Sequence, residues 1–199
     1  MKKYLAALLF LAQAPLASAG VYTTEASFLT QLQPGYYLED FNGYKYGNPL
    51  DGNQTSQTYG PVNGYSWTAS APNGLFSNPG ALSTNNAIDL LTITFTGDPV
   101  TALGGIFAST DANGNVIQQL VTITLSDGTT ASLTGSDFRG FTSAAPITFL
   151  TIDAIDQPSS NWPQLDHFYV GSAIPEPTSL ALLGLGSLLL APWRRYTRG

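Results

Sequence analysis

The stretch VTITLSDGTT, residues 121–130, decides the fold class. Val121, Ile123 and Leu125 alternate with threonines, which is the pattern of a β-strand with one buried face. The Ser-Asp-Gly that follows favours a tight turn, and a second threonine-rich run begins directly after it. This stretch therefore predicts a β-hairpin.

The same alternation recurs along most of the chain, in runs separated by Gly, Pro, Asn and Asp. One short helix precedes these runs: Thr24 is its expected N-cap, Phe28 and Leu32 lie on its apolar stripe, and Pro34-Gly35 ends it. The predicted strands are residues 36–41, 64–70, 81–83, 91–95, 100–109, 116–125, 129–133, 138–142, 147–155 and 165–170. Strands spaced about 8–12 residues apart without a helical period predict an all-β fold, an antiparallel β-sandwich.

The N-terminus has the pattern of an export signal. Lys2 and Lys3 precede an apolar stretch, residues 4–11, and Ala17-Ser18-Ala19 is a small-residue cleavage motif before Gly20. These features predict a signal peptide over residues 1–19, which signal peptidase removes between Ala19 and Gly20.

The C-terminus has three consecutive parts. Pro175-Glu176-Pro177 precedes an uncharged run of twelve residues, 180–191, of which seven are leucine, and Arg194, Arg195 and Arg198 follow. We expect the run to form a short transmembrane helix with its arginines on the cytoplasmic side of the membrane. The alternative is a helix packed on the soluble body, but such a helix usually shows a polar face, which this run lacks.

This ending resembles the PEP-CTERM sorting signal of bacterial surface proteins. The resemblance implies recognition and processing by an exosortase-type membrane enzyme, with Pro175, Glu176, Pro177, Arg194 and Arg195 as the sorting residues. It also implies a role in the cell envelope or extracellular matrix, often in bacteria that make extracellular polysaccharide. The chain then divides into a signal peptide (1–19), a β-sandwich body (20–173) and a sorting signal (174–199).

A second resemblance concerns the body. Asp40-Phe41-Asn42-Gly43, residues 125–130, residues 146–154 and Leu165-Asp166-His167-Phe168 are similar to β-rich bodies found ahead of such signals. Those bodies resemble the jelly-roll architecture of many carbohydrate-binding modules. Such modules often hold a structural Ca²⁺ between carboxylates near the first strand and an aspartate in the last, which implies Glu39, Asp40 and Asp166 as candidate ligands. The alternative is that these carboxylates only accept hydrogen bonds where the chain ends meet.

Charge excludes one class of partner. Only Lys45 and Arg139 are basic within residues 20–173, against twelve acidic residues, so the body carries a formal charge of −10. Such a surface repels the phosphates of nucleic acids, while divalent cations and neutral polysaccharides remain candidate partners. The chain has no cysteine, which excludes disulfides and thiol catalysis.

Candidate catalytic residues are few. His167 is the only histidine and lies within a predicted strand, where an outward side chain needs no function. Asp153 and Asp156 are the carboxylate pair that glycoside hydrolysis would need, although acids at strand ends are also ordinary turn formers. An aromatic platform for sugar rings could come from Tyr44, Tyr46, Tyr59, Tyr65 and Trp67, or these residues could belong to the core. We therefore interpret the body as non-catalytic, structural or carbohydrate-binding; the alternative is a secreted polysaccharide-acting hydrolase.

Overall fold

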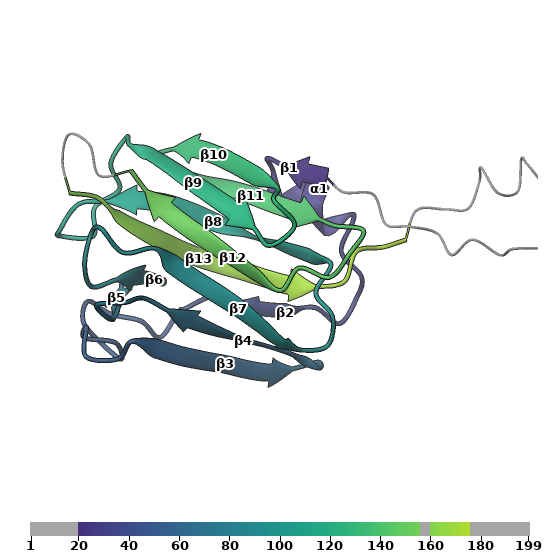
Figure 1. Cartoon of the computed structure of the whole chain (residues 1–199), viewed down its shortest axis with the longest axis horizontal. Coiled ribbons are helices and arrows are strands. Elements are labelled where there is room, and N and C mark those ends of the chain that lie inside the picture. Colours follow the sequence, from purple (N-terminus) through teal and green to yellow (C-terminus); the bar gives the residue numbers. More distant parts are fainter. Residues whose placement is uncertain (1–19, 156–159, 176–199) are drawn as a thin grey trace, which may run out of the picture. The chain divides into compact units, whose positions relative to one another are not determined.

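A computed structural model describes residues 20–155 and 160–175 of the chain (Figure 1). Residues 20–174 belong to one compact unit, called the body below. Its elements are β1 (Gly20–Tyr22), α1 (Glu25–Leu29), β2 (Tyr37–Glu39), β3 (Ser56–Val62), β4 (Tyr65–Ser70), β5 (Leu75–Asn78), β6 (Ala81–Thr84), β7 (Leu91–Gly97), β8 (Ala102–Thr110), β9 (Leu120–Leu125), β10 (Thr130–Thr134), β11 (Ser136–Thr142), β12 (Phe149–Ala154) and β13 (Trp162–Gly171).

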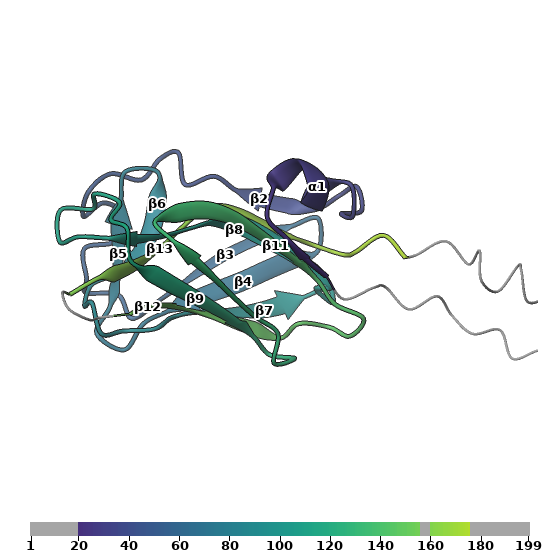
Figure 2. The same ribbon diagram turned by 90° about the horizontal axis from the view of Figure 1, so that it is seen from above.

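The strands form two antiparallel sheets that pack face to face (Figure 2). The seven-stranded sheet has the order β1-β11-β8-β13-β6-β5, and β2 also pairs with β13. The six-stranded sheet has the order β10-β9-β12-β7-β4-β3. The predicted all-β fold with antiparallel sheets is therefore confirmed.

The strand order is that of a jelly roll. From β6 to β13 the strands run β6-β13-β8-β11 in one sheet and β7-β12-β9-β10 in the other, so that most connections cross between the sheets. The remaining strands extend this framework, with β3 and β4 beside β7 and β5 beside β6. This winding brings the beginning of β13, late in the chain, next to the end of β6, about 80 residues earlier.

The main core lies between the two sheets and contains the inward residues that the alternation predicted. Val121, Ile123 and Ile152 are fully buried, as are their partners across the sheets, such as Leu103 and Phe107. At the β3–β4 end, Trp67 is also fully buried and stacks on Tyr59 with 3.9 Å between ring centroids. Aromatic rings therefore fill this end of the core.

A second, smaller core covers the outer face of the seven-stranded sheet. The predicted helix is present as α1: the Thr24 hydroxyl accepts from the Ser27 N–H at 3.3 Å, as an N-cap does. Phe28 of α1 packs over Gly104 and Gly140, which face each other across β8 and β11. A Cβ on Gly140 would lie 2.5 Å from the Phe28 ring, so the glycine makes room for that ring. Figure 2 shows α1 on the side of this sheet away from the six-stranded sheet.

Four details of the strand prediction are wrong. Residues 20–22 were not predicted as a strand and form β1, which pairs with β11. Residues 56–62 and 75–78 were expected to be loops and form β3 and β5, because pairing with β4 and β6 compensates for their polar sequences. The strand expected to begin at residue 116 begins at Leu120. In β13, a bulge between Asp166 and Tyr169 shifts the alternation, so Leu165 and Phe168 both face the main core.

Two predictions concern the ends of the chain. The predicted signal peptide, with Ala17 and Ala19, and the predicted transmembrane helix lie outside the described residues. Within residues 20–155 and 160–175, no helix has the length and hydropathy of a membrane span.

Candidate functional site

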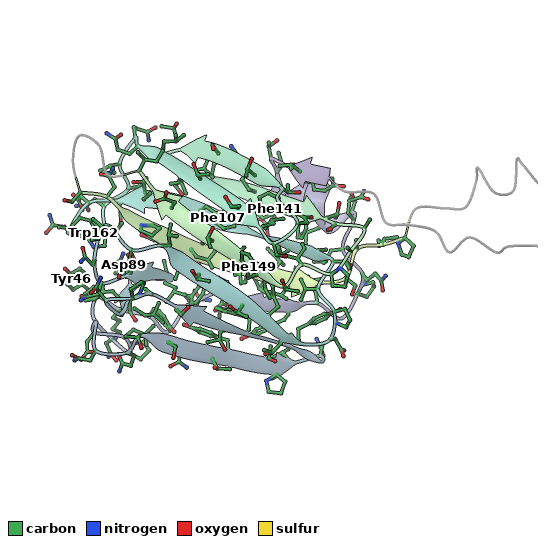
Figure 3. The ribbon with its side chains drawn as sticks, in the orientation of Figure 1. Tyr46, Asp89, Phe107, Phe141, Phe149 and Trp162 are labelled. Carbon is green, nitrogen blue, oxygen red and sulfur yellow. The ribbon has the colours of Figure 1, made fainter. Side chains whose placement is uncertain are left out.

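A hollow of about 100 Å³ opens where the ends of β5, β6 and β8 meet the beginning of β13. We call it the end pocket. Three aromatic side chains contribute to its wall: Tyr46, Phe76 and Trp162. In Figure 3, Tyr46 and Trp162 lie at the same end of the body. Its polar lining comes mainly from Asn78, Thr84, Asn85, Thr110 and Asp111.

Tyr46 is held in place by a tight turn. Lys45 and Asn48 exchange backbone hydrogen bonds of 2.9 Å, and the Gly47 N–H donates to the carbonyl of Ser77 in β5. The Tyr46 ring packs edge-on against Phe76, with 4.9 Å between ring centroids, and remains 57 % exposed. Its hydroxyl donates to the Ala112 carbonyl at 3.2 Å, which ties this turn to the loop after β8.

Trp162 begins β13 on the other side of the pocket. Its backbone pairs with Thr110 at the end of β8, and its indole N–H points to the Asn85 carbonyl at 3.4 Å. Trp162 is partly exposed at the first position of β13. An aromatic side chain held in this way offers an apolar face to a ligand without having to reorient.

Asn78 is a buried polar residue in the pocket lining. It is 5 % exposed, and its amide nitrogen lies 3.4 Å from Gln164 Oε1. Gly114 approaches it closely: a Cβ there would lie 2.9 Å from Asn78 Oδ1, and the φ of +79° also favours glycine. The Gly114 backbone therefore helps to close one side of the pocket.

Asp111 contributes the carboxylate of the pocket. Its Oδ1 accepts the N–H groups of Asn113 and Asn115 at 2.8 and 2.9 Å, and Oδ2 accepts the Asn115 amide at 3.1 Å. These hydrogen bonds, chiefly those from Asn115, hold the pKa of Asp111 below its usual value. The group is therefore ionised at neutral pH and serves as an acceptor.

The candidate calcium ligands are only partly brought together. Glu39 accepts the Tyr37 hydroxyl at 2.8 Å and the Phe41 N–H at 3.2 Å, while Asp40 accepts the side-chain amide of Asn42 at 2.6 Å. Burial raises the pKa of Asp166, and the nearby charge of Asp40 adds to this effect. Among the described residues, no three carboxylate or imidazole groups cluster as metal ligands would. Calcium binding stays a prediction, for which melting with Ca²⁺ and with chelator is the deciding measurement.

His167 occupies the β13 bulge with a φ of +48°. Its backbone N–H donates to Asp166 Oδ1 at 2.6 Å, and its Nδ1 lies 3.5 Å from the same oxygen. The side chain is 43 % exposed. Asp153 lies on β12, and Asp156, its expected catalytic partner, falls outside the described residues.

The predicted aromatic platform does not form. Trp67 and Tyr59 are in the main core, where burial raises the pKa of Tyr59 above its usual value, and Tyr44 packs against them. Of the five candidates only Tyr46 lies at the end pocket, and the sequence reasoning missed Trp162, Phe76 and Asn78. The available signal was a tryptophan at the start of the last strand, outside its apolar alternation.

Towards its C-terminus, the chain matches one known protein feature. The profile of the PEP-CTERM protein-sorting motif matches residues 173–195. The chain carries a PEP-CTERM sorting motif. No characterised protein and no solved structure is similar enough to this chain to count as a match.

The motif indicates an exported surface protein that an exosortase sorts. Its first two residues belong to the fold: Ala173 forms a β-bridge with Leu32, and the Ile174 N–H donates to the Gln31 carbonyl at 2.7 Å. Pro175 is the last described residue, and Glu176, Pro177, Arg194 and Arg195 lie beyond it. The sorting motif therefore follows the body without a spacer.

Proposed function

We propose that this exported protein is a non-catalytic binding module of the cell surface that takes the end of a neutral polysaccharide chain in its end pocket. The observation that carries the proposal is the pairing of an exposed tyrosine, Tyr46, and a partly exposed tryptophan, Trp162, with amide and hydroxyl groups in one hollow. Sugar rings offer apolar C–H faces to aromatic rings and hydroxyls to such polar groups.

The size of the pocket favours a chain end. At about 100 Å³ it is smaller than the roughly 300–1,000 Å³ of typical small-molecule sites. A single ring or part of one can enter, while the rest of the chain stays outside. Neutral sugars also suit a body with a formal charge of −10, which repels anionic polymers.

The chemistry of the lining supports a binding role over hydrolysis. Glycoside hydrolysis generally needs two carboxyl groups, one of them protonated to act as the acid. Asp111 is the one acidic residue in the pocket lining, and its hydrogen bonds keep it ionised. We infer that it accepts a sugar hydroxyl.

Calorimetric titration of the body with short neutral oligosaccharides tests this function. Loss of either aromatic wall, in Tyr46→Ala or Trp162→Ala, should weaken binding about tenfold, since an aromatic contact contributes about 0.5–1.5 kcal/mol beyond its buried area. Tyr46→Phe is the matched control, because it keeps the ring and loses only the hydroxyl. Equal affinities for wild type and both alanine variants would overturn the assignment of the pocket, and release of reducing sugar would favour the hydrolase.

A further inference from the structure

The outer face of the six-stranded sheet is chemically uniform. Fourteen of its outward positions carry serine or threonine, and the others are Leu120, Phe149 and Asp153, together with Gly60, Pro61 and Val62 at the irregular end of β3. No lysine, arginine or glutamate occurs among these positions, although charged residues are the usual way to keep a sheet face soluble. Nothing in the described part of the chain covers this face.

The hydroxyl groups of this face are aligned across the whole sheet. Strand register places one Ser or Thr of each strand in a single row: Ser56, Ser70, Thr92, Thr151, Thr124 and Thr130. We call this set the hydroxyl row. It crosses five strand spacings of roughly 4.8 Å each, a length of about 24 Å. A row of this length matches an extended polymer better than a small molecule.

The row differs from its neighbours in hydrogen bonding. Beside it, hydroxyls bond to one another: Thr58 to Thr68 at 2.9 Å, and Thr122 to Ser132 at 3.3 Å. Within the residues that the structure describes, the six hydroxyls of the row have no protein hydrogen-bond partner. Each can both donate and accept, so the row offers to a partner uncharged hydrogen-bonding groups that are not committed to other protein groups.

An exposed aromatic ring lies beside the middle of the row. Phe149 is on β12, two residues before Thr151, and faces Thr94 across the sheet. It is 40 % exposed, whereas its neighbour Leu150 is fully buried on the opposite side of the strand. Figure 3 shows Phe149 on the six-stranded sheet, away from Tyr46 and Trp162.

We propose that the hydroxyl row and Phe149 form a second binding surface, which takes an extended neutral polysaccharide chain along the row. The free hydroxyls bond to those of the polymer, and Phe149 contacts the apolar face of one sugar ring. Each hydrogen bond contributes little, about 0.5–1.5 kcal/mol at most, so affinity rises with the number of sugar units in contact. This surface is separate from the end pocket and does not depend on it.

Charge and polarity favour this partner over the alternatives. A nucleic acid or anionic lipid is repelled by the acidic body. A second copy of the chain would need apolar area to form a stable interface, and the large apolar groups on this face and its borders are few: Phe149, Leu120, Ile155 and Val62. Two separate polysaccharide sites on one body would also allow the protein to link two chains of a matrix.

Affinity electrophoresis of the body tests the proposal. The body is a compact unit that contains both cores, so it is used alone. The probes are hydroxyethyl cellulose, galactomannan and dextran, each cast in a separate native gel. We expect at least one polymer to retard the wild type, and short oligosaccharides added to the same gel to compete poorly, because they span only part of the row.

Two face variants and a matched control decide the outcome. Phe149→Ala and the double variant Thr92→Val with Thr151→Val should each reduce retardation about tenfold; valine keeps the β-propensity of threonine and removes the hydroxyl. Thr58→Val is the control, because the Thr58 hydroxyl already bonds to Thr68. Melting curves confirm that each variant is folded.

Three results would overturn the proposal. The first is equal retardation of wild type and both face variants, and the second is the absence of retardation by all three polymers. The third is a concentration-dependent dimer in sedimentation that Phe149→Ala abolishes, which would assign the face to a second copy of the chain. Loss of polymer binding in Tyr46→Ala alone would support the end pocket and reject the face, so the two proposals fail separately.

Discussion

The outer faces of the two sheets differ in whether other residues cover them. On the seven-stranded sheet, α1 and the residues that follow it bury an apolar patch, and the Tyr169 hydroxyl donates to the Glu25 carboxylate of α1. On the six-stranded sheet, hydroxyl side chains face solvent directly. One sheet thus gains stability from its outer face, while the outer face of the other is the proposed polysaccharide surface. Stability and binding should therefore respond to substitutions on opposite faces.

A matched pair of phenylalanines tests this difference with the largest expected effect. Phe28 is fully buried on the covered face, whereas Phe149 is 40 % exposed on the open one. Phe28→Ala should lower the free energy of unfolding by about 3–5 kcal/mol, and Phe149→Ala by about 1 kcal/mol or less. Urea denaturation of the body measures both. Similar losses of unfolding free energy in the two variants would mean that Phe149, on the open face, is also packed against other residues.

The glycines beneath α1 provide a second test of the covered face. In Gly140→Ala the added Cβ would overlap the Phe28 ring, and overpacking of this kind costs about 1–3 kcal/mol. Ser132→Ala, on the open face, should change stability by about 0.5 kcal/mol or less. If Gly140→Ala has no measurable effect in thermal melting, α1 moves easily and the covered face is less rigid than its packing implies.

A smaller effect on stability is expected at Asp166, close to the point where β2 pairs with β13. Its sign is opposite, because the substitution should stabilise the fold. Burial raises the pKa of Asp166, and an acid with a raised folded pKa loses stability as pH rises from about 4 through that folded value. Asp166→Asn should therefore raise the melting temperature at pH 7 and leave it unchanged near pH 3. Asp40→Asn should give part of the same gain, because the Asp40 charge adds to the effect. A lower melting temperature of Asp166→Asn at pH 7 would contradict this sign and favour a bound cation.

The sequence predicted the parts of the fold in which one strand face is buried. Leu91, Ile93 and Ile152 alternate with threonines because one side of each strand meets the core and the other meets solvent. It missed β3 and β5, whose polar residues pair with neighbours and carry little alternation. The bulge in β13 was also missed, because it arises where the strand changes one neighbour from β6 to β2.

The candidate sites were harder to predict for a related reason. The end pocket brings Tyr46 next to Trp162, and the hydroxyl row runs across six strands. Both depend on which strands pair and in which register, and a local sequence pattern does not contain that information. The threonines themselves were visible, but alternation only showed that they face outward. Asp40 and Asp166 were expected to approach each other, and the Asp40 charge does influence Asp166.

The smallest expected effect comes from an ion pair on β11, the second strand of the seven-stranded sheet, on the face of that strand opposite to α1. Arg139 donates to Asp137 at 2.6 Å, and the side chain of Asp137 is 51 % exposed. This hydrogen bond holds the pKa of Asp137 below its usual value, while burial opposes it weakly. The pair therefore stabilises the fold above about pH 4, the ordinary aspartate value, and the contribution disappears as pH falls through the lower folded pKa.

Asp137→Asn should cost only about 0.2–1 kcal/mol at pH 7, since solvent screens an exposed pair, and high salt should remove most of the difference. Arg139 also donates to the Phe138 carbonyl at 2.6 Å, so its guanidinium keeps a partner in the variant. Denaturation of both proteins at pH 7 and near pH 3 should show the curves converging in acid. A loss above about 2 kcal/mol would mean that this part of the seven-stranded sheet depends on the charge pair as well as on apolar packing.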